Sequence, residues 1–479
     1  MAQDSFHETT SDFLSWLQEK GVQLSPNIAV HDFRQEGRGR GVIAIADIQE
    51  DEVLFSIPRS AVLNLNNTIS ALPTEAMQET ISAMPSWLAL TTLMMIESLR
   101  GDSNWASYLT ILPEKLDSLI FWNTEDLAHL QASTVVQKIG RDKAGEMFAQ
   151  YVAPLGLANY DTGLLHRVAS IIMAYAFDIP EEKPNDGANE TTSANGEDED
   201  DDLVLDNGDD EKTILSMIPL ADMLNADADR NNARLCCDHE DLEMRSIKPI
   251  TSGEEIFNDY GQLPRSDLLR RYGFITEQYA PYDVAEISTE SIKSAFETGF
   301  SLSNGSCVEP LSKLEVESRC DLADREGFLE DSYDLAHPSP DGLSIPDELV
   351  ALVYLLLLND ENLDSIKNGN PISSRSKIAT ELVGQLLTQL LQRRAVEYGT
   401  TIEDDKITLQ QATLSDRAQK AIQVRLGEKK VLKGAIDEAN TFAASNKRLR
   451  GNATSQEPAA NKKRKPPIKF QTMKKNRTT

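Results

Sequence analysis

Two neighbouring segments carry the polar and aromatic residues that could take part in chemistry. Residues 219–233, PLADMLNADADRNNA, place Asn225 in a turn that mixes apolar and polar residues. Residues 253–274, GEEIFNDYGQLPRSDLLRRYGF, place Tyr260 at the end of a strand-like run and Tyr272 at the end of a short helical one. Asparagine amides and tyrosine hydroxyls can hold a polar ligand, and aromatic faces can stabilise a cation. Taken alone, a tyrosine at the end of an apolar strand is more often a core or rim residue.

A glycine-rich turn, GRGRG, occupies Gly37–Gly41. Residues 39–44 formally match the dinucleotide fingerprint G-x-G-x-x-A. That motif requires a helix after the glycines, whereas VIAIADI alternates like a strand, so we reject a Rossmann fold. A glycine turn between strands still lets backbone groups approach a ligand closely, although a plain tight hairpin would use the same residues.

No metal site is predicted from the side chains that usually bind metals. The six histidines are scattered, and none lies at a ligand spacing from a cysteine. Residues 227–238 begin like an EF-hand loop, but Asn232 and Asp238 replace the required glycine and glutamate. Four cysteines without a C-x-x-C pair in 479 residues predict reduced thiols in the cytosol or nucleus.

Residue periodicity divides the chain into strand-rich and helical stretches. Ser11 is predicted to cap an N-terminal helix that stops at Gly21. Helices are predicted from about residue 69 to 177, most clearly at Trp87–Leu99 and His166–Phe177, and again from about 284 to 440. β-branched residues predict strands in VIAIADI, EVLFSIP, ILSMIPL, ARLCCDH, LEMRSI and EEIFNDY.

The chain combines an acidic body with a basic tail. The net charge is −30, yet residues 441–479 hold eleven Lys or Arg and one Glu, so the remainder carries −40. Fourteen acidic residues lie in 181–211, which is too polar to bury a core and is predicted to be a disordered insert. No direct DNA binding is expected, because no basic groove is visible. The acidic body suits a basic protein as partner, but the same charge could serve solubility alone.

Two basic clusters in the tail, 447–450 and 462–465, are typical of a bipartite nuclear localisation signal. A basic arm that touches RNA is the alternative interpretation. The longest apolar run, Leu349–Leu358, is too short to span a bilayer and predicts a buried helix. No signal peptide is visible at the N-terminus, and no membrane association is expected.

Four segments, in order along the chain, resemble a SET-domain protein-lysine methyltransferase. EGRGRGVIAIADIQEDEVLFSIPRS resembles the N-terminal strands of that domain, and SNWASYLTILPE with the helix ending MAYAFD resembles a helical insert. ADMLNADADRNNARL and NDYGQLPRSDLLRRYGF resemble its C-terminal half. The insert is typical of the branch that contains the Rubisco large-subunit and ribosomal-protein lysine methyltransferases. The similarity covers roughly Gln18–Asn440.

The resemblance implies an α+β protein with a β-rich SET domain, a helical insert within it, and an all-α C-terminal substrate-binding domain. The implied segments are an N-terminal helix with the first SET strands (1–65), the helical insert (66–180), the acidic disordered insert (181–211), the C-terminal SET part (212–283), the substrate-binding domain (284–440) and the basic disordered tail (441–479).

The resemblance also implies roles for individual residues. Tyr260 would be the active-site tyrosine. S-adenosylmethionine would be the cofactor, with a site made of Arg38, Gly39, Arg40, Tyr175, Asn225, Ala226 and Phe274. Trp105, Asp222 and Tyr272 would contact the substrate. Many family members have His where this chain has Ala226, and the Cys-rich zinc segment that follows many SET domains is absent.

The reaction that the resemblance implies is methyl transfer from S-adenosylmethionine to a lysine amine, with a ribosomal protein of the large subunit as the expected substrate. An aromatic channel would strip water from the lysine, lower its pKa and align its lone pair with the methyl group. Two alternatives stay open: a non-catalytic SET-fold adaptor or chaperone for basic proteins, and an enzyme that methylates another nucleophile such as histidine. We expect a monomer that acts in the nucleus, with the cytoplasm as an alternative.

Overall fold

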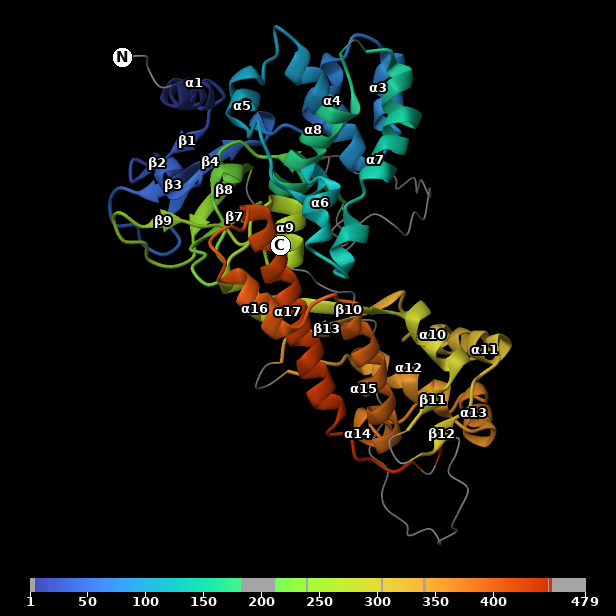
Figure 1. Cartoon of the computed structure of the whole chain (residues 1–479). Coiled ribbons are helices and arrows are strands. Elements are labelled where there is room, and N and C mark those ends of the chain that lie inside the picture. The colour runs from blue at the N-terminus through green and yellow to red at the C-terminus, as the bar shows by residue number, and fades with distance from the viewer. Residues whose placement is uncertain are drawn as a thin grey trace.

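The structure is a computed structural model that describes residues 5–157, 159–181, 212–237, 240–302, 305–338, 342–446 and 448–449. Figure 1 shows a β-rich part beside a group of upper helices, and a second, mainly helical part below them. The chain starts at the β-rich part, passes through the upper helices, returns to the strands and then enters the lower part. Apart from Glu181, the predicted acidic insert lies outside the described residues.

The β-rich part combines N-terminal strands with strands from much later in the chain. One antiparallel sheet has the order β1-β4-β8-β7, and the other has the order β2-β3-β9. In the second sheet, Val42 lies opposite Val30 on one side and Ile256 on the other. The strands are β1 (Gln23–Leu24), β2 (Ile28–Asp32), β3 (Arg40–Ala44), β4 (Val53–Pro58), β7 (Ala233–Cys236), β8 (Asp241–Ser246) and β9 (Glu255–Ile256).

The upper helices, apart from α6, share one hydrophobic core with these sheets. The predicted helix at Trp87–Leu99 is confirmed as α4, which is buried along most of its length and packs against α8. The upper helices are α2 (Leu65–Thr68), α3 (Glu75–Ser82), α4 (Ser86–Leu99), α5 (Ala106–Ile111), α6 (Thr124–Ala128), α7 (Arg141–Met147) and α8 (Thr162–Tyr175).

The helix predicted to end at Phe177 ends at Tyr175, because the next residues form a strand. β5 (Ala176–Pro180) pairs along its whole length with β6 (Thr213–Met217). Beyond this pair, the Glu181 N–H donates to the Lys212 carbonyl at 2.9 Å. The chain therefore leaves and re-enters the domain at one place, and the long acidic insert does not separate α8 from the residues after β6.

The first helix is longer than the sequence predicts. α1 (Ser5–Glu19) begins well before Ser11, so the prediction that Ser11 caps this helix is wrong. The early turns are held by Phe6, whose ring centroid lies 3.7 Å from the guanidinium of Arg40. Gly21, with a φ of 82°, stops the helical segment as predicted.

The lower part is built around α12 (Asp347–Leu357), and the buried helix predicted at Leu349–Leu358 is confirmed. Two short antiparallel sheets, β10–β13 and β11–β12, accompany the helices and were not indicated by the periodicity. The other elements are β10 (Val284–Ser288), α10 (Thr289–Thr298), β11 (Phe300–Ser301), β12 (Cys307–Val308), α11 (Lys313–Arg325), β13 (Ser332–Ala336), α13 (Asp360–Lys367), α14 (Arg375–Ile378), α15 (Glu381–Val396) and α16 (Ile402–Leu409).

One long helix, α17 (Asp416–Ala439), joins the lower part to the upper one, as Figure 1 shows. Its C-terminal half packs in the lower core with α15. Its N-terminal half meets α9 (Arg265–Tyr272) and residues 119–135 in a smaller core that includes Leu269 and Val424. α9 therefore lies where the strands, the upper helices and the lower part come together.

The beginning of the tail is ordered, contrary to the disorder predicted from residue 441. Ala444 pairs with Thr380, and Leu449 pairs with Leu358 and is 2% exposed. These contacts bury apolar surface of the tail on the lower part, which explains why it is held there. Most of the two basic clusters lies outside the described residues.

Candidate active site

The two motif segments meet because residues 225–227 run beside residues 257–260. Ala226 forms a parallel bridge with Asn258, whose N–H donates to the Asn225 carbonyl at 2.9 Å. The strand predicted at EEIFNDY therefore pairs first with β3 through β9, and then with the asparagine segment. At the end of this run the Tyr260 hydroxyl lies 3.4 Å from the Leu224 carbonyl oxygen. Asn225 and Tyr260 are thus placed within one site.

The Asn225 amide is fixed by a carboxylate that the sequence did not single out. Its Nδ2 donates to Glu255 Oε1 at 2.7 Å and lies 3.4 Å from the Arg40 carbonyl oxygen. Glu255 also forms an ion pair with Arg38 at 2.7 Å. Glu255 therefore ties the glycine turn to the asparagine segment. Glu255 could not be predicted from its neighbours in the sequence, because Arg38 lies 217 residues before it and Asn225 lies 30 residues before it.

The glycine that matters for this contact is Gly41. A Cβ added there would lie 2.7 Å from the Phe33 ring, 2.8 Å from Asn225 Nδ2 and 3.0 Å from Glu255 Oε1. A Cβ added at Gly39 would meet nothing within 4 Å. The close approach expected of the glycine turn is therefore made by Gly41 toward protein side chains, while the turn is open at Gly39.

The predicted cofactor residues on this turn present different groups. The Arg40 side chain turns toward α1, where it donates to Thr10 Oγ1 at 2.9 Å, so only its backbone faces Asn225. The Gly39 carbonyl accepts the Phe33 N–H at 2.9 Å. The strand that follows, β3, confirms the rejection of a Rossmann fold.

An aromatic cluster surrounds Tyr260. Its ring stacks on Tyr272 at a centroid distance of 4.5 Å and an interplanar angle of 10°, and Phe274 lies 5.9 Å from Tyr272. Leu263, Leu268 and Tyr279 form the buried part of the same cluster. Burial raises the pKa of Tyr272 to about 12, and burial with the neighbouring Tyr272 raises the pKa of Tyr260 well above its usual value. Both hydroxyls stay protonated at neutral pH.

Tyr175 and Asp222 also lie near Tyr260. Burial raises the pKa of Asp222 to about 7, although the Tyr108 hydroxyl donates to its carboxylate at 2.5 Å. Burial, and then the charge of Asp222, raises the pKa of Tyr175 to about 12. The structure therefore brings Tyr175, Asp222, Tyr260 and Tyr272 together from four different segments of the chain. Tyr108, which holds Asp222, was not predicted.

Trp105 lies away from this cluster. It precedes α5, is 7% exposed and packs with its ring centroid 5.8 Å from that of Trp16 on α1. A side chain buried between α1 and α5 cannot reach a protein substrate in this conformation. Of the three residues predicted to contact substrate, Asp222 and Tyr272 are at the site and Trp105 is in the core.

The site offers hydroxyl groups that the protein itself does not use. Among the described residues, the hydroxyls of Tyr175 and Tyr272 have no hydrogen-bond partner, and the Tyr279 hydroxyl is buried without one. Buried polar groups are normally paired, so unpaired ones point to a ligand. Within the described ranges, no three His, Cys, Asp or Glu side chains are grouped to hold a metal ion. In the same ranges, no helix is long and apolar enough to cross a membrane.

Two family profiles match the chain. The SET domain matches residues 39–261, and the Rubisco LSMT substrate-binding domain matches residues 312–432. Ribosomal lysine N-methyltransferase 4 of Saccharomyces cerevisiae is 32% identical over 375 residues, which cover 74% of this chain and 72% of that protein. N-lysine methyltransferase SETD6 of Bos taurus is 27% identical over 462 residues, covering 88% of this chain and 93% of that protein.

Solved structures show the same fold. A structure of Rubisco LSMT bound to AdoMet aligns with a TM-score of 0.65 and 19% identity, covering 90% of this chain and 91% of that one. A second structure, of the SET domain of LSMT bound to lysine and AdoHcy, gives a TM-score of 0.66. The predicted α+β architecture with a SET domain and a helical C-terminal region is confirmed. The C-terminal domain is not all-α as predicted, because it contains the sheets β10–β13 and β11–β12.

Proposed function

We propose that this chain, which belongs to the SET-domain protein-lysine N-methyltransferases, methylates a lysine in a ribosomal protein of the large subunit. The name of the yeast relative supports a ribosomal substrate. The acidic body supports it as well, because residues 1–440 carry a charge of −40 that would attract a basic protein.

S-adenosylmethionine supplies the methyl group when it is bound. The backbone at 38–40 and the Asn225–Ala226 segment would hold it, with Tyr175 and Phe274 beside them. These residues fit such a ligand, because the turn is open at Gly39 and the Tyr175 hydroxyl has no partner among the described residues. Ala226 can contribute a backbone contact but no stacking side chain.

The aromatic cluster prepares the lysine amine. The same burial that raises the pKa of Tyr260 and Tyr272 disfavours an ammonium ion, so a lysine between these rings loses its proton more easily than in water. Ring faces stabilise the positive charge that remains on the methylated amine. Tyr260, whose hydroxyl has only a 3.4 Å contact with Leu224, is free to orient the amine. Asp222, whose charge acts on both Tyr260 and Tyr175, would face the arriving ammonium.

The observation that carries this proposal is the stack of Tyr260 on Tyr272 directly beside Asn225. The test is transfer of label from S-adenosylmethionine to purified proteins of the large ribosomal subunit. We expect label on a lysine of one protein with the wild-type enzyme and at least about 100-fold less with Tyr260→Phe, the cost typical of losing one oriented polar group. Label on histidine would contradict the lysine assignment. Cofactor binding without transfer to any ribosomal protein would contradict the substrate, and neither binding nor transfer would favour the adaptor.

We also place the enzyme in the nucleus, where new ribosomal proteins would meet it. The basic clusters of the tail support this location. A full-length fluorescent fusion that stays in the cytoplasm would contradict it.

A further inference from the structure

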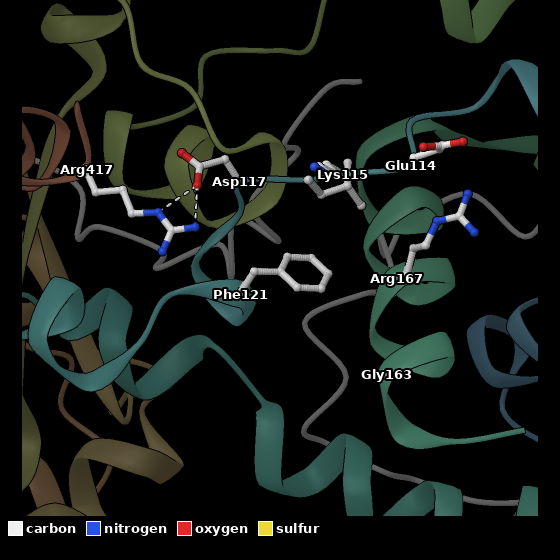
Figure 2. A pocket seen from close by; sticks show the side chains of 8 residues that line it. Glu114, Lys115, Asp117, Phe121, Gly163, Arg167 and Arg417 are labelled. Carbon is white, nitrogen blue, oxygen red and sulfur yellow. Dashed lines mark hydrogen bonds and ion pairs between the residues drawn. The ribbon is translucent and has the colours of Figure 1, made fainter. Parts of the chain in front are cut away.

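A cavity of about 530 Å³ opens between residues 114–121, α8 and the start of α17, apart from the tyrosine cluster. Its chemically active lining is Glu114, Lys115, Asp117, Phe121, Arg167 and Arg417. Figure 2 shows Arg417 and Arg167 on opposite sides, with the Phe121 ring between them. The cavity therefore combines three cations and two carboxylates with an aromatic surface.

The two arginines of this cavity differ in how many ion pairs and hydrogen bonds they form with the rest of the protein. Arg417 forms ion pairs with Asp117 and Asp126, each at 2.8 Å. Arg167 has only a 3.4 Å contact with the Pro113 carbonyl, and its Nε is buried without a partner. No carboxylate among the described residues forms an ion pair with Arg167, and Asp117, one of the two carboxylates of the cavity, is paired with Arg417 and Lys420. Arg167 is thus the cation of the cavity that combines a buried, unpartnered Nε with the absence of an ion pair, whereas Lys115 is exposed to water.

The cavity is joined to the aromatic cluster by direct contacts. A Cβ added at Gly273, between Tyr272 and Phe274, would lie 2.6 Å from the backbone of Asp117. Lys420 donates both to Asp117, at 3.0 Å, and to the Gly273 carbonyl, at 2.9 Å. The wall of the cavity and the wall of the cluster are therefore held against each other.

The distance between the two sites follows from α8. Arg167 and Tyr175 lie eight residues apart on this helix, which corresponds to about 12 Å along its axis. An extended peptide advances roughly 3.3 Å per residue, so about four residues span this distance. A substrate segment with its lysine in the aromatic cluster can place a neighbouring side chain in the cavity.

We propose that this cavity is a specificity pocket for an acidic side chain that lies three to five residues from the target lysine in the substrate. Arg167 binds the carboxylate through its planar fork, and Phe121 packs on the methylene stem. This inference rests on the proposed lysine methylation but not on the ribosomal identity of the substrate. A single acidic residue near the lysine is compatible with a substrate that is basic overall.

The test uses the full-length enzyme and a set of eleven-residue peptides with one central lysine. Each peptide carries one Glu at a different position, and a matched set carries Gln there. Binding is measured by fluorescence anisotropy, so that it does not depend on turnover. Glu at three to five positions from the lysine, on one side, is expected to bind roughly 10- to 100-fold more tightly than Gln, the worth of a hydrogen-bonded charge.

Variants distinguish Arg167 from general positive charge. Arg167→Gln is expected to abolish the preference for Glu, and Arg167→Lys to keep part of it, because Lys retains the charge without the fork. Lys115→Gln, which removes an exposed cation at the rim of the same cavity, is expected to leave the preference nearly unchanged. Thermal melting of each variant checks that it is folded.

The outcomes separate this inference from the proposed function. Equal binding of Glu and Gln peptides by the wild type, or a preference that survives in Arg167→Gln, would overturn the pocket assignment. Methyl transfer is measured on the same peptides and on ribosomal proteins. Absence of transfer with an intact, Arg167-dependent Glu preference would contradict the proposed function and leave the pocket standing.

Discussion

Two buried polar clusters of this molecule are built in opposite ways. The aromatic cluster around Tyr260 contains several hydroxyls that have no partner among the described residues. The second cluster, the junction, lies along α17 where the lower part meets the upper helices, and it contains many paired charges. Asp405 there accepts bonds from Arg425 at 2.6 Å, Lys429 at 2.6 Å and Thr400 at 2.8 Å.

The junction satisfies nearly every group that it buries. Arg265 and Asp283 form an ion pair at 2.6 Å with side chains only 3% and 4% exposed. Glu428 accepts bonds from Ser133 and Tyr398, each at 2.6 Å. Near Tyr260, the Tyr279 hydroxyl is buried without a partner and the hydroxyls of Tyr175 and Tyr272 have none among the described residues, which indicates a site for binding and reaction. The junction, in contrast, holds two parts of the molecule together.

The largest expected effect is on the junction. Asp405→Asn removes the shared negative charge of two buried cations, Arg425 and Lys429, and should lower the free energy of unfolding by about 3 to 5 kcal/mol. Denaturant unfolding measures this change. Asp437→Asn is the control, because its pair with Lys433 is exposed and should matter by less than about 1 kcal/mol. Similar losses of unfolding free energy in both variants would contradict the distinction between the buried and the exposed ion pairs.

A second prediction tests the glycine turn of the site. Gly41→Ala should weaken S-adenosylmethionine binding by about 100-fold, because its Cβ would displace Asn225 and Glu255 from their contact. Gly39→Ala is the matched control, since a Cβ there meets nothing within 4 Å. Calorimetric titration with the cofactor compares the two. Equal binding by both variants would show that the packing at Gly41 does not shape the site.

A third, smaller effect depends on pH. Burial raises the pKa of Glu428 to about 7, above its value in the unfolded chain, although Ser133 and Tyr398 donate to it. The protonated form is therefore favoured by folding, and this contribution is lost as the pH rises through about 7. Between about pH 5 and pH 7 the wild type should lose on the order of 2 kcal/mol relative to Glu428→Gln. Parallel stability curves over this range would contradict the shifted pKa.

The sequence was most informative where structure is local. Periodicity identified α4 and α12, and the motifs placed Asn225, Tyr260 and Tyr272 in the right order. The predicted helix ends were wrong where a contact between residues far apart in the sequence decides the local conformation. α1 starts early because Phe6 meets Arg40, and α8 ends early because β5 pairs with β6 across the acidic insert.

The partners of the site residues could not be predicted from the sequence either. Glu255 and Tyr108 look like ordinary strand and helix residues, yet they hold Asn225 and Asp222. Trp105 stands in a motif that resembles the family, but its ring is buried against Trp16. The resemblance could locate the motif segments, whereas the direction of each side chain depends on packing between elements far apart in the chain.

The Tyr260 hydroxyl, held only by a 3.4 Å contact with Leu224, serves the reaction, whereas the firmly paired hydroxyls at the junction serve the fold. The most direct test is the same substitution in both clusters, Tyr260→Phe and Tyr398→Phe, with methyl transfer and unfolding measured for each. Tyr398 donates to buried Glu428 at 2.6 Å, so its loss should cost about 1 to 3 kcal/mol of stability and change transfer by less than about 2-fold. Tyr260→Phe should reduce transfer by about 100-fold or more with little change in stability. A Tyr260→Phe enzyme that transfers methyl groups normally would contradict the account.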